Sequence, residues 1–373
     1  MVMCTVQAVI TINRIDHSLI QQWDEWFPFN PKKNLEVQDL FRDYSYQGLS
    51  PSELIKTYYL VQHYQIKDSL GASSLMERLL KPEQYQNLSQ SEFFTTMSLL
   101  DQIPESRTAI EKILFKINPE WFEFFQSSLN SSELNNEHLK SLLTYNLEPD
   151  DNFVGRYSEG VKLYLILSKN RKSPGFFILK DHANRWVTTE SGELWSQIAL
   201  ASSRHDLPFY SANGQTPQGI MTIDGVMPEA NNQSLFGKNR RLVINFIPRS
   251  EDNETLKSFL PQEHQELDWW KQSIIARDIG RRYFRIHGTG VKCQDESASF
   301  YPFVRTSGCI AQREVEGKFN DQRILLNHLM RAMDLETDFE NETLIKGVLK
   351  VVELKHRESA ISLKDIELLI DSF

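Results

Sequence analysis

The sequence predicts a multidomain protein of the α plus β class, with an all-helical N-terminal domain at residues 1–150 and a β-rich domain at residues 151–373. Up to about residue 150, apolar side chains recur at helical spacing behind helix-start signals. Beyond it they form short β-branched and aromatic runs separated by turn signals. The polar, proline-containing segment 146–152 lies between the two patterns and marks the boundary.

Two capping boxes support the helical prediction. Ser50 and Ser89 are each followed three residues later by a glutamate, and each pair precedes an apolar periodic run. The expected helices are 50–64, 89–100, 118–125 and 137–145. Their aromatic stripes are interpreted as core, with a ligand groove as the alternative. We expect this domain to be a recognition or positioning module and the candidate site for a partner protein.

The second half is expected to contain a sandwich or barrel-like sheet interrupted by helices. The predicted strands are 161–167, 176–179, 195–201, 219–223, 242–246, 283–287 and 344–354. The predicted helices are an insertion at 261–280, then 321–333 and 362–370. The final strand and helix are assigned to the same domain as the strands before them.

The amino-acid composition argues against one class of function. The chain has 373 residues, 40% of them apolar, and a net charge of −9. This acidic balance argues against general nucleic-acid binding, which requires a basic footprint. One local basic cluster remains, interpreted either as a groove near the chemistry or as a solvated face: Arg281, Arg282, Arg285, Arg305 and Arg313.

Targeting signals are weak. No apolar run reaches the roughly 18 residues needed to span a bilayer, so no integral membrane segment is expected. The first residues lack a basic n-region and a small-residue cleavage site, so no signal peptide is visible.

The cysteines do not form a recognisable framework. Cys4, Cys293 and Cys309 are too few and too widely spaced for a disulfide scaffold or a cysteine zinc site. Cys309 ends the segment Thr306-Ser307-Gly308-Cys309, which is interpreted as a tight loop leading into a short helix or turn. Cys293 lies in a polar segment, 292–299, a poor place for a preorganised nucleophile.

A histidine lies upstream of Cys309. Strand alternation puts His287 on the face opposite Phe284 and Ile286. The pair Cys309 and His287 is the minimum set for thiolate chemistry. We expect backbone N–H groups and a nearby imidazolium to lower the thiol pKa. The alternative is a buried structural cysteine with a hydrogen-bonded structural histidine.

Two motifs resemble one known family. They are His287-Gly288-Thr289 followed by Thr306-Ser307-Gly308-Cys309-Ile310, and the upstream segment 213–223, Asn-Gly-Gln-Thr-Pro-Gln-Gly-Ile-Met-Thr-Ile. Their order and content resemble the L,D-transpeptidase (YkuD) catalytic domain family. The resemblance covers roughly residues 155–355, and the helical domain lies outside it.

The resemblance implies an L,D-transpeptidase-like catalytic domain, with the helical insertion, that acts on peptidoglycan stem peptides. Cys309 would be the nucleophile and His287 the base. The product would be a 3→3 crosslink or another amide. Oxyanion stabilisation and orientation would come from Ser307, Gly308 and Gly288, and substrate binding from Thr289, Arg305 and Arg313. Neither a metal nor a cofactor is implied. The family also implies a periplasmic or cell-wall location.

Departures from the family pattern keep the substrate open. Ser307 stands where histidine is common, Ala311 stands where arginine or asparagine is common, and Arg313 is the candidate replacement. The loop between His287 and Cys309 is also long. The alternatives are an L,D-carboxypeptidase or wall-releasing hydrolase, a non-catalytic wall-binding module, and a cytoplasmic acyltransferase with a non-wall substrate.

Overall fold

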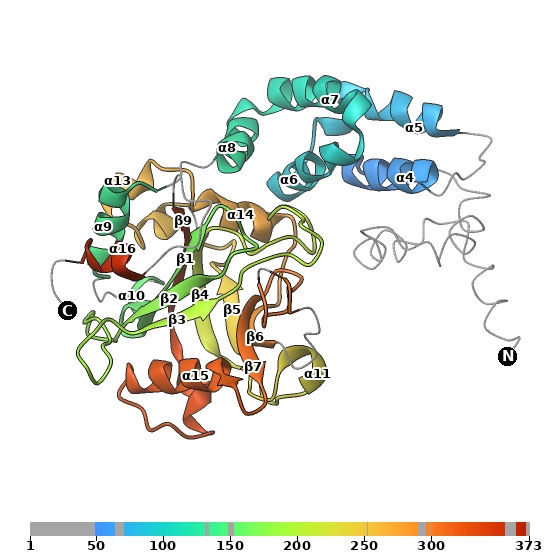
Figure 1. The fold of residues 1–373 in the computed structure, drawn as a ribbon. Helices are drawn as coiled ribbons and strands as arrows, with labels where there is room; N and C mark the ends of the chain where they lie inside the picture. Colours follow the sequence, from blue (N-terminus) through green and yellow to red (C-terminus); the bar gives the residue numbers. More distant parts are fainter. Residues whose placement is uncertain are drawn as a thin grey trace, which may run out of the picture. The chain divides into compact units, whose positions relative to one another are not determined.

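The computed structural model describes residues 49–63, 71–130, 134–147, 153–251, 253–289, 296–298, 300–354 and 363–370. These residues form a mixed α/β protein that divides into two compact units, residues 1–126 and 127–373 (Figure 1). The division lies before the boundary expected at 150, so α9 (Asn136–Thr144) belongs to the second unit. Within that unit the Leu134 N–H donates to the Glu353 carbonyl at 3.3 Å, which ties this segment to the end of β9.

The elements described in the first unit are all helical. Its helices are α4 (Pro51–His63), α5 (Gly71–Leu79), α6 (Gln90–Leu99), α7 (Pro104–Ile117) and α8 (Pro119–Leu129), with the short 3₁₀ turns η2 (Pro82–Tyr85) and η3 (Leu100–Gln102). The last residues of α8 lie in the second unit. The sequence did not single out α5 or α7, and Tyr64, expected in the first helix, lies outside the described residues.

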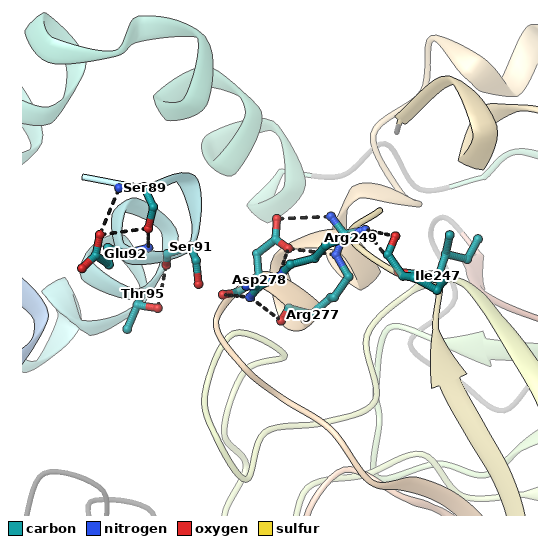
Figure 2. Close-up of polar contacts among 9 residues, drawn as sticks. Ser89, Ser91, Glu92, Thr95, Ile247, Arg249, Arg277 and Asp278 are labelled. Carbon is teal, nitrogen blue, oxygen red and sulfur yellow. Dashed lines mark hydrogen bonds and ion pairs between the residues drawn. The ribbon is translucent and has the colours of Figure 1, made fainter. Parts of the chain in front are cut away.

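Both capping boxes are confirmed. Ser89 Oγ accepts the Glu92 N–H at 3.3 Å, and the Glu92 carboxylate accepts the Ser89 N–H at 3.0 Å (Figure 2). Ser50 and Glu53 make the same reciprocal pair. Each box satisfies donors that the first helical turn leaves without partners, which is why the two helices begin where they do.

The aromatic side chains of the first unit form its core. Phe93 and Phe94 are fully buried. Phe93 meets Trp121 edge-on with ring centroids 5.6 Å apart, and Phe94 stacks on Phe124 at 5.8 Å. Such pairs add to the free energy gained by burying the rings. The interpretation of these stripes as core is therefore confirmed for these residues.

The second unit is built on a nine-stranded curled mixed sheet with the order β3-β2-β1-β9-β4-β5-β6-β7-β8. The strands are β1 (Val161–Ser168), β2 (Gly175–Lys180), β3 (Ser196–Ala199), β4 (Gly219–Val226), β5 (Leu242–Phe246), β6 (Phe284–Thr289), β7 (Ile310–Val315), β8 (Phe319–Asn320) and β9 (Lys346–Leu354). The pairs β1–β9 and β6–β7 are parallel. Beyond β3, Leu200 bridges Ala311 of β7, so the sheet curls back on itself.

One face of this sheet carries the main core. Alternate residues of the strands pack with Leu325, Leu326 and Leu329 of α15 (Asp321–Arg331). In β6 the core residues are Phe284 and Ile286, so the residues between them belong to the opposite face. The opposite face is also largely covered, since all eight residues of β1 are buried.

Further helices surround the sheet. They are α10 (Gly155–Ser158), α11 (Gln233–Phe236), α12 (Asn253–Lys257), α13 (Gln262–Gln265), α14 (Lys271–Asp278), η4 (Asn341–Leu344) and α16 (Leu363–Glu367). The expected insertion at 261–280 is thus helical but split into α13 and α14. Arg249 and Arg277 both contact the Asp278 carboxylate at the end of α14, at 3.2 and 2.8 Å (Figure 2). Ser362, expected to cap the last helix, lies outside the described residues.

The segment after Cys309 corrects the sequence prediction. We expected a short helix or turn, and the chain instead forms β7, which runs parallel to β6. The physical reason is tertiary. Ile310 enters the core opposite Ile286, and this non-local pairing outweighs local propensity.

Candidate active site

The pairing of β6 with β7 brings Cys309 and His287 onto one face. Ile286 pairs with Ile310, and His287 pairs with Ala311. Cys309 therefore lies level with Arg285, two positions from His287. Because alternate residues of a strand share a face, Cys309 and His287 lie diagonally across the two strands on the side away from the core. The predicted pair of residues is brought together.

His287 is fixed in one tautomer. Its Nδ1 lies 2.9 Å from the Gly288 carbonyl oxygen, so Nδ1 carries the proton and donates it. The side chain is buried, and the Phe236 ring meets the imidazole edge-on at 5.0 Å. Burial, together with the nearby Arg241 charge, lowers the His287 pKa to about 4, against the Gly288 hydrogen bond, which raises it. His287 is therefore neutral at neutral pH and has Nε2 free to accept a proton.

The pKa of the Cys309 thiol shifts in the direction opposite to the one expected from the sequence. Cys309 is partly exposed, and its pKa is raised above the ordinary value because the loss of solvent around the sulfur outweighs the Arg285 backbone hydrogen bond and the Arg285, Arg281 and Arg241 charges, all of which lower it. The expectation of a lowered thiol pKa is wrong. The imidazolium invoked for it is absent, since His287 is itself held neutral.

The two pKa shifts bear on the protonation state of the pair before a substrate binds. The His287 pKa is lowered to about 4 and the thiol pKa is raised. Both directions favour a neutral thiol beside a neutral imidazole over a thiolate beside an imidazolium. This arrangement suits general base catalysis, in which His287 takes the proton as the sulfur attacks.

The cysteine loop, residues 306–309, is held by the predicted motif at 213–223. Thr216 Oγ1 donates to the Gly308 carbonyl at 2.8 Å. The buried Arg281 guanidinium donates to the Gly214 and Gln215 carbonyls at 2.6 and 2.9 Å. The two motifs that resemble the family are thus joined by hydrogen bonds.

Gly308 cannot carry a side chain in this loop. Its φ is +112°, outside the range that L residues adopt readily, and a Cβ would lie 2.3 Å from the Arg281 guanidinium. Tyr283, just before β6, also has a positive φ of 64°. Its carbonyl lies 3.9 Å from the Cys309 sulfur. Strained backbone on both sides of the thiol is typical of functional sites.

The loop changes the set of oxyanion donors. The Gly308 N–H donates to Thr306 Oγ1 at 3.3 Å, and Thr306 Oγ1 donates to the Cys309 carbonyl at 2.6 Å. The Gly308 N–H, one of the predicted oxyanion donors, is therefore already occupied. The Ser307 N–H remains a candidate donor, and we add the Cys309 N–H, which lies in the same loop beside the exposed Ser307 side chain.

The residues expected to bind substrate have other partners. The Thr289 hydroxyl donates to the Gln312 carbonyl at 3.2 Å and accepts the Val304 N–H at 3.1 Å. Arg313 pairs with Asp321 at 2.6 Å, and Arg305 pairs with Asp206. These contacts hold the chain around β7 in place, so Thr289, Arg305 and Arg313 each have a structural role in the fold.

Two other arginines lie closer to the chemistry. Arg241 precedes β5 level with His287, and Arg285 lies level with Cys309. The Arg241 guanidinium packs over Phe236 at 4.3 Å and donates to Asn231. The contacts shown for these two arginines among the described residues are to neutral oxygens, since Arg285 donates to the Phe284 carbonyl and Arg241 to the Asn231 side chain. Arg241 is not among the site residues predicted from the sequence, where its only signal is its place directly before a predicted strand.

Within the described ranges, no three or more His, Cys, Asp or Glu side chains gather in a way that could hold a metal ion. No helix in the same ranges has the length and apolar character to cross a bilayer. Cys4 and Cys293 lie outside the described residues.

The chain was compared with known proteins. No protein-family model, no curated protein and no solved structure matches it.

The raised thiol pKa predicts slow alkylation. Since a raised pKa leaves less thiolate at any given pH, Cys309 should react with iodoacetamide at pH 7 at least several-fold more slowly than free cysteine. Its rate should reach half its maximum at a higher pH than the rate of free cysteine does, since the thiol pKa is raised. The measurement is the alkylation rate against pH by mass spectrometry in a Cys4→Ser, Cys293→Ser protein.

The control for this experiment is the same protein with Cys309→Ser added, which should take up no label. A half-maximal rate below pH 7 would show a thiolate at rest and would contradict the neutral pair.

Proposed function

We propose that this chain is a cysteine-dependent L,D-transpeptidase that acts on peptidoglycan stem peptides through an acyl-thioester on Cys309. The observation that carries the proposal is the placement of Cys309 and His287 on one face of β6 and β7, with Nδ1 of His287 bound to the Gly288 carbonyl. A nucleophile, a base and a group that orients the base form the general arrangement of covalent acyl transfer. The resemblance of the two motifs supports the choice of substrate.

The geometry allows the following sequence of steps. The Cys309 sulfur attacks the carbonyl of an L-configured centre while His287 Nε2 accepts the thiol proton. Backbone N–H groups of Ser307 and Cys309 stabilise the oxyanion. The tetrahedral intermediate collapses, the C–N bond breaks, and His287 returns the proton to the departing D-alanine amine. An acceptor amine then loses a proton to His287 and attacks the thioester carbonyl. The C–S bond breaks, the new amide is released, and His287 returns the proton to the Cys309 sulfur.

Substrate charge fits the arginines on this face. Stem peptides carry carboxylates, and Arg241 and Arg285 present guanidinium groups beside the two reacting side chains. Because Arg305 and Arg313 are already paired with Asp206 and Asp321, we assign carboxylate binding to Arg241 and Arg285 instead. A guanidinium binds a carboxylate well because its donors match the two oxygens.

The reaction is tested on disaccharide tetrapeptide. We expect a crosslinked dimer with loss of D-alanine, detected by mass spectrometry of the products. Cys309→Ala should abolish the dimer, since it removes the thiol that lies beside His287, and Cys293→Ala should leave the yield unchanged.

Other products would point to other functions. Tripeptide alone, with Cys309 required, identifies water as the acceptor and replaces the transpeptidase with an L,D-carboxypeptidase. Activity lost with Cys293→Ala and kept with Cys309→Ala would refute the nucleophile. No product from the parent protein would favour a non-catalytic wall-binding module or a non-wall substrate.

The first unit is proposed to recognise or position the substrate. Its helices form a separate compact unit with its own aromatic core. Deletion of residues 1–126 should lower activity on intact sacculi at least several-fold more than activity on small muropeptides. The cut is placed at 126 because α9 belongs to the second unit.

Circular dichroism and product analysis on muropeptides serve as controls for the truncated protein. Equal losses on sacculi and on muropeptides, with the fold retained, would refute the recognition role.

A further inference from the structure

Three lysines are buried on the face of the sheet that faces away from the main core. Lys162 of β1, Lys180 of β2 and Lys350 of β9 are 2%, 3% and 1% exposed. Lys162 pairs directly with Lys180, and Tyr164 of β1 pairs directly with Lys350. We call Lys162, Lys180, Lys350 and Tyr164 the lysine cluster. Buried lysines normally have a carboxylate partner, so three together require an explanation.

Two of the lysines have hydrogen-bond acceptors. Lys162 Nζ donates to the His182 carbonyl at 3.0 Å, and also to the Ser158 carbonyl at 2.5 Å. Lys180 Nζ donates to Asn146 Oδ1 at 3.1 Å and lies 4.9 Å from the centre of the Trp186 ring. These neutral oxygens and the ring satisfy the ammonium groups in part but provide no negative charge.

The Lys350 ammonium differs from the other two in its hydrogen bonding. Among the described residues, its Nζ and the Tyr164 hydroxyl are buried and have no hydrogen-bond partner. The Lys350 ammonium lies 5.2 Å from the Tyr145 ring and 5.5 Å from the Tyr164 ring. Two buried donors on directly paired residues, both unsatisfied, indicate a missing acceptor.

The charges around Lys350 have one sign. Burial and the charges of Lys180 and Lys162 lower the Lys350 pKa to about 7. His264 also faces Lys350, but burial lowers its pKa to about 4, so it is neutral at neutral pH. Asp181 acts on Lys162, where it partly offsets the effect of burial. A small anion would satisfy both free donors and offset the repulsion among the three ammonium groups.

We propose that the lysine cluster is a buried site for a monovalent inorganic anion of the halide class, held between Lys350 Nζ and the Tyr164 hydroxyl. A halide fits because it accepts hydrogen bonds from both donors without needing a donor of its own. It supplies one full negative charge to a site that lacks one. The site is separate from the proposed active site, which lies on β6 and β7, and does not depend on the proposed function.

The probes are chloride and bromide, compared with gluconate at constant ionic strength in the full-length protein. Binding to the folded state alone raises the unfolding temperature by mass action. The midpoint of the second unit should rise by about 3–5 °C for each tenfold increase in halide above its dissociation constant. Gluconate, a much larger anion than a halide, should leave the midpoint unchanged.

Variants assign the effect to these residues. Lys350→Met should remove the halide dependence and be at least as stable as the parent protein without halide. Tyr164→Phe, which loses only the hydroxyl, should weaken halide binding at least several-fold. Lys238→Met is the matched control, because Lys238 is exposed and pairs with Glu316 at 3.0 Å. It should keep the full halide dependence.

Chloride-35 line broadening provides a readout that does not depend on unfolding. The parent protein should broaden the chloride signal, bromide should reverse the broadening, and Lys350→Met should abolish it. The proposal is overturned if chloride and gluconate shift the midpoint equally, if Lys350→Met keeps the halide dependence, or if the parent and this variant broaden the signal equally.

Discussion

The parallel pairing of β6 with β7 determines the relation between the two reactive side chains. Ile286 and Ile310 meet in the core, and their alternation leaves His287 and Cys309 together on the other face. A shift of one residue in this register would place one of the two in the core. The whole candidate site therefore depends on two apolar side chains that take no part in the chemistry.

A second layer of contacts holds the cysteine loop in its strained form. The Arg281 guanidinium donates hydrogen bonds to the Gly214 and Gln215 carbonyls and occupies the space that a side chain at Gly308 would need. Thr216 donates a hydrogen bond to the Gly308 carbonyl. Burying a guanidinium costs free energy unless its N–H groups are hydrogen-bonded. The Gly214 and Gln215 carbonyls therefore stabilise the buried Arg281 charge, and Arg281 in turn holds these carbonyls in place. The same charge also moderates the rise of the Cys309 pKa, which links loop support to the chemistry.

Much of the fold could be predicted from local patterns, whereas the electrostatics of the site could not. Strand 242–246 was predicted residue for residue, because its apolar run is bounded by polar segments. β7 was missed because Gln312, Arg313 and Glu314 interrupt its apolar pattern, and its partner strand is non-local. The direction of the Cys309 pKa shift depends on burial, which no spacing rule reports. Arg241 was missed because its relation to His287 arises only when β5 pairs with β6.

The central claim is that Cys309, with His287 as its base, forms an acyl-thioester. It is tested most directly by intact-protein mass spectrometry after incubation with a carbapenem, an acyl donor that leaves the enzyme slowly. We expect one added carbapenem mass, located on the peptide that contains Cys309. His287→Gln should slow its formation by about 10²–10⁴-fold. An unmodified protein, or an adduct on Cys293, would contradict the account.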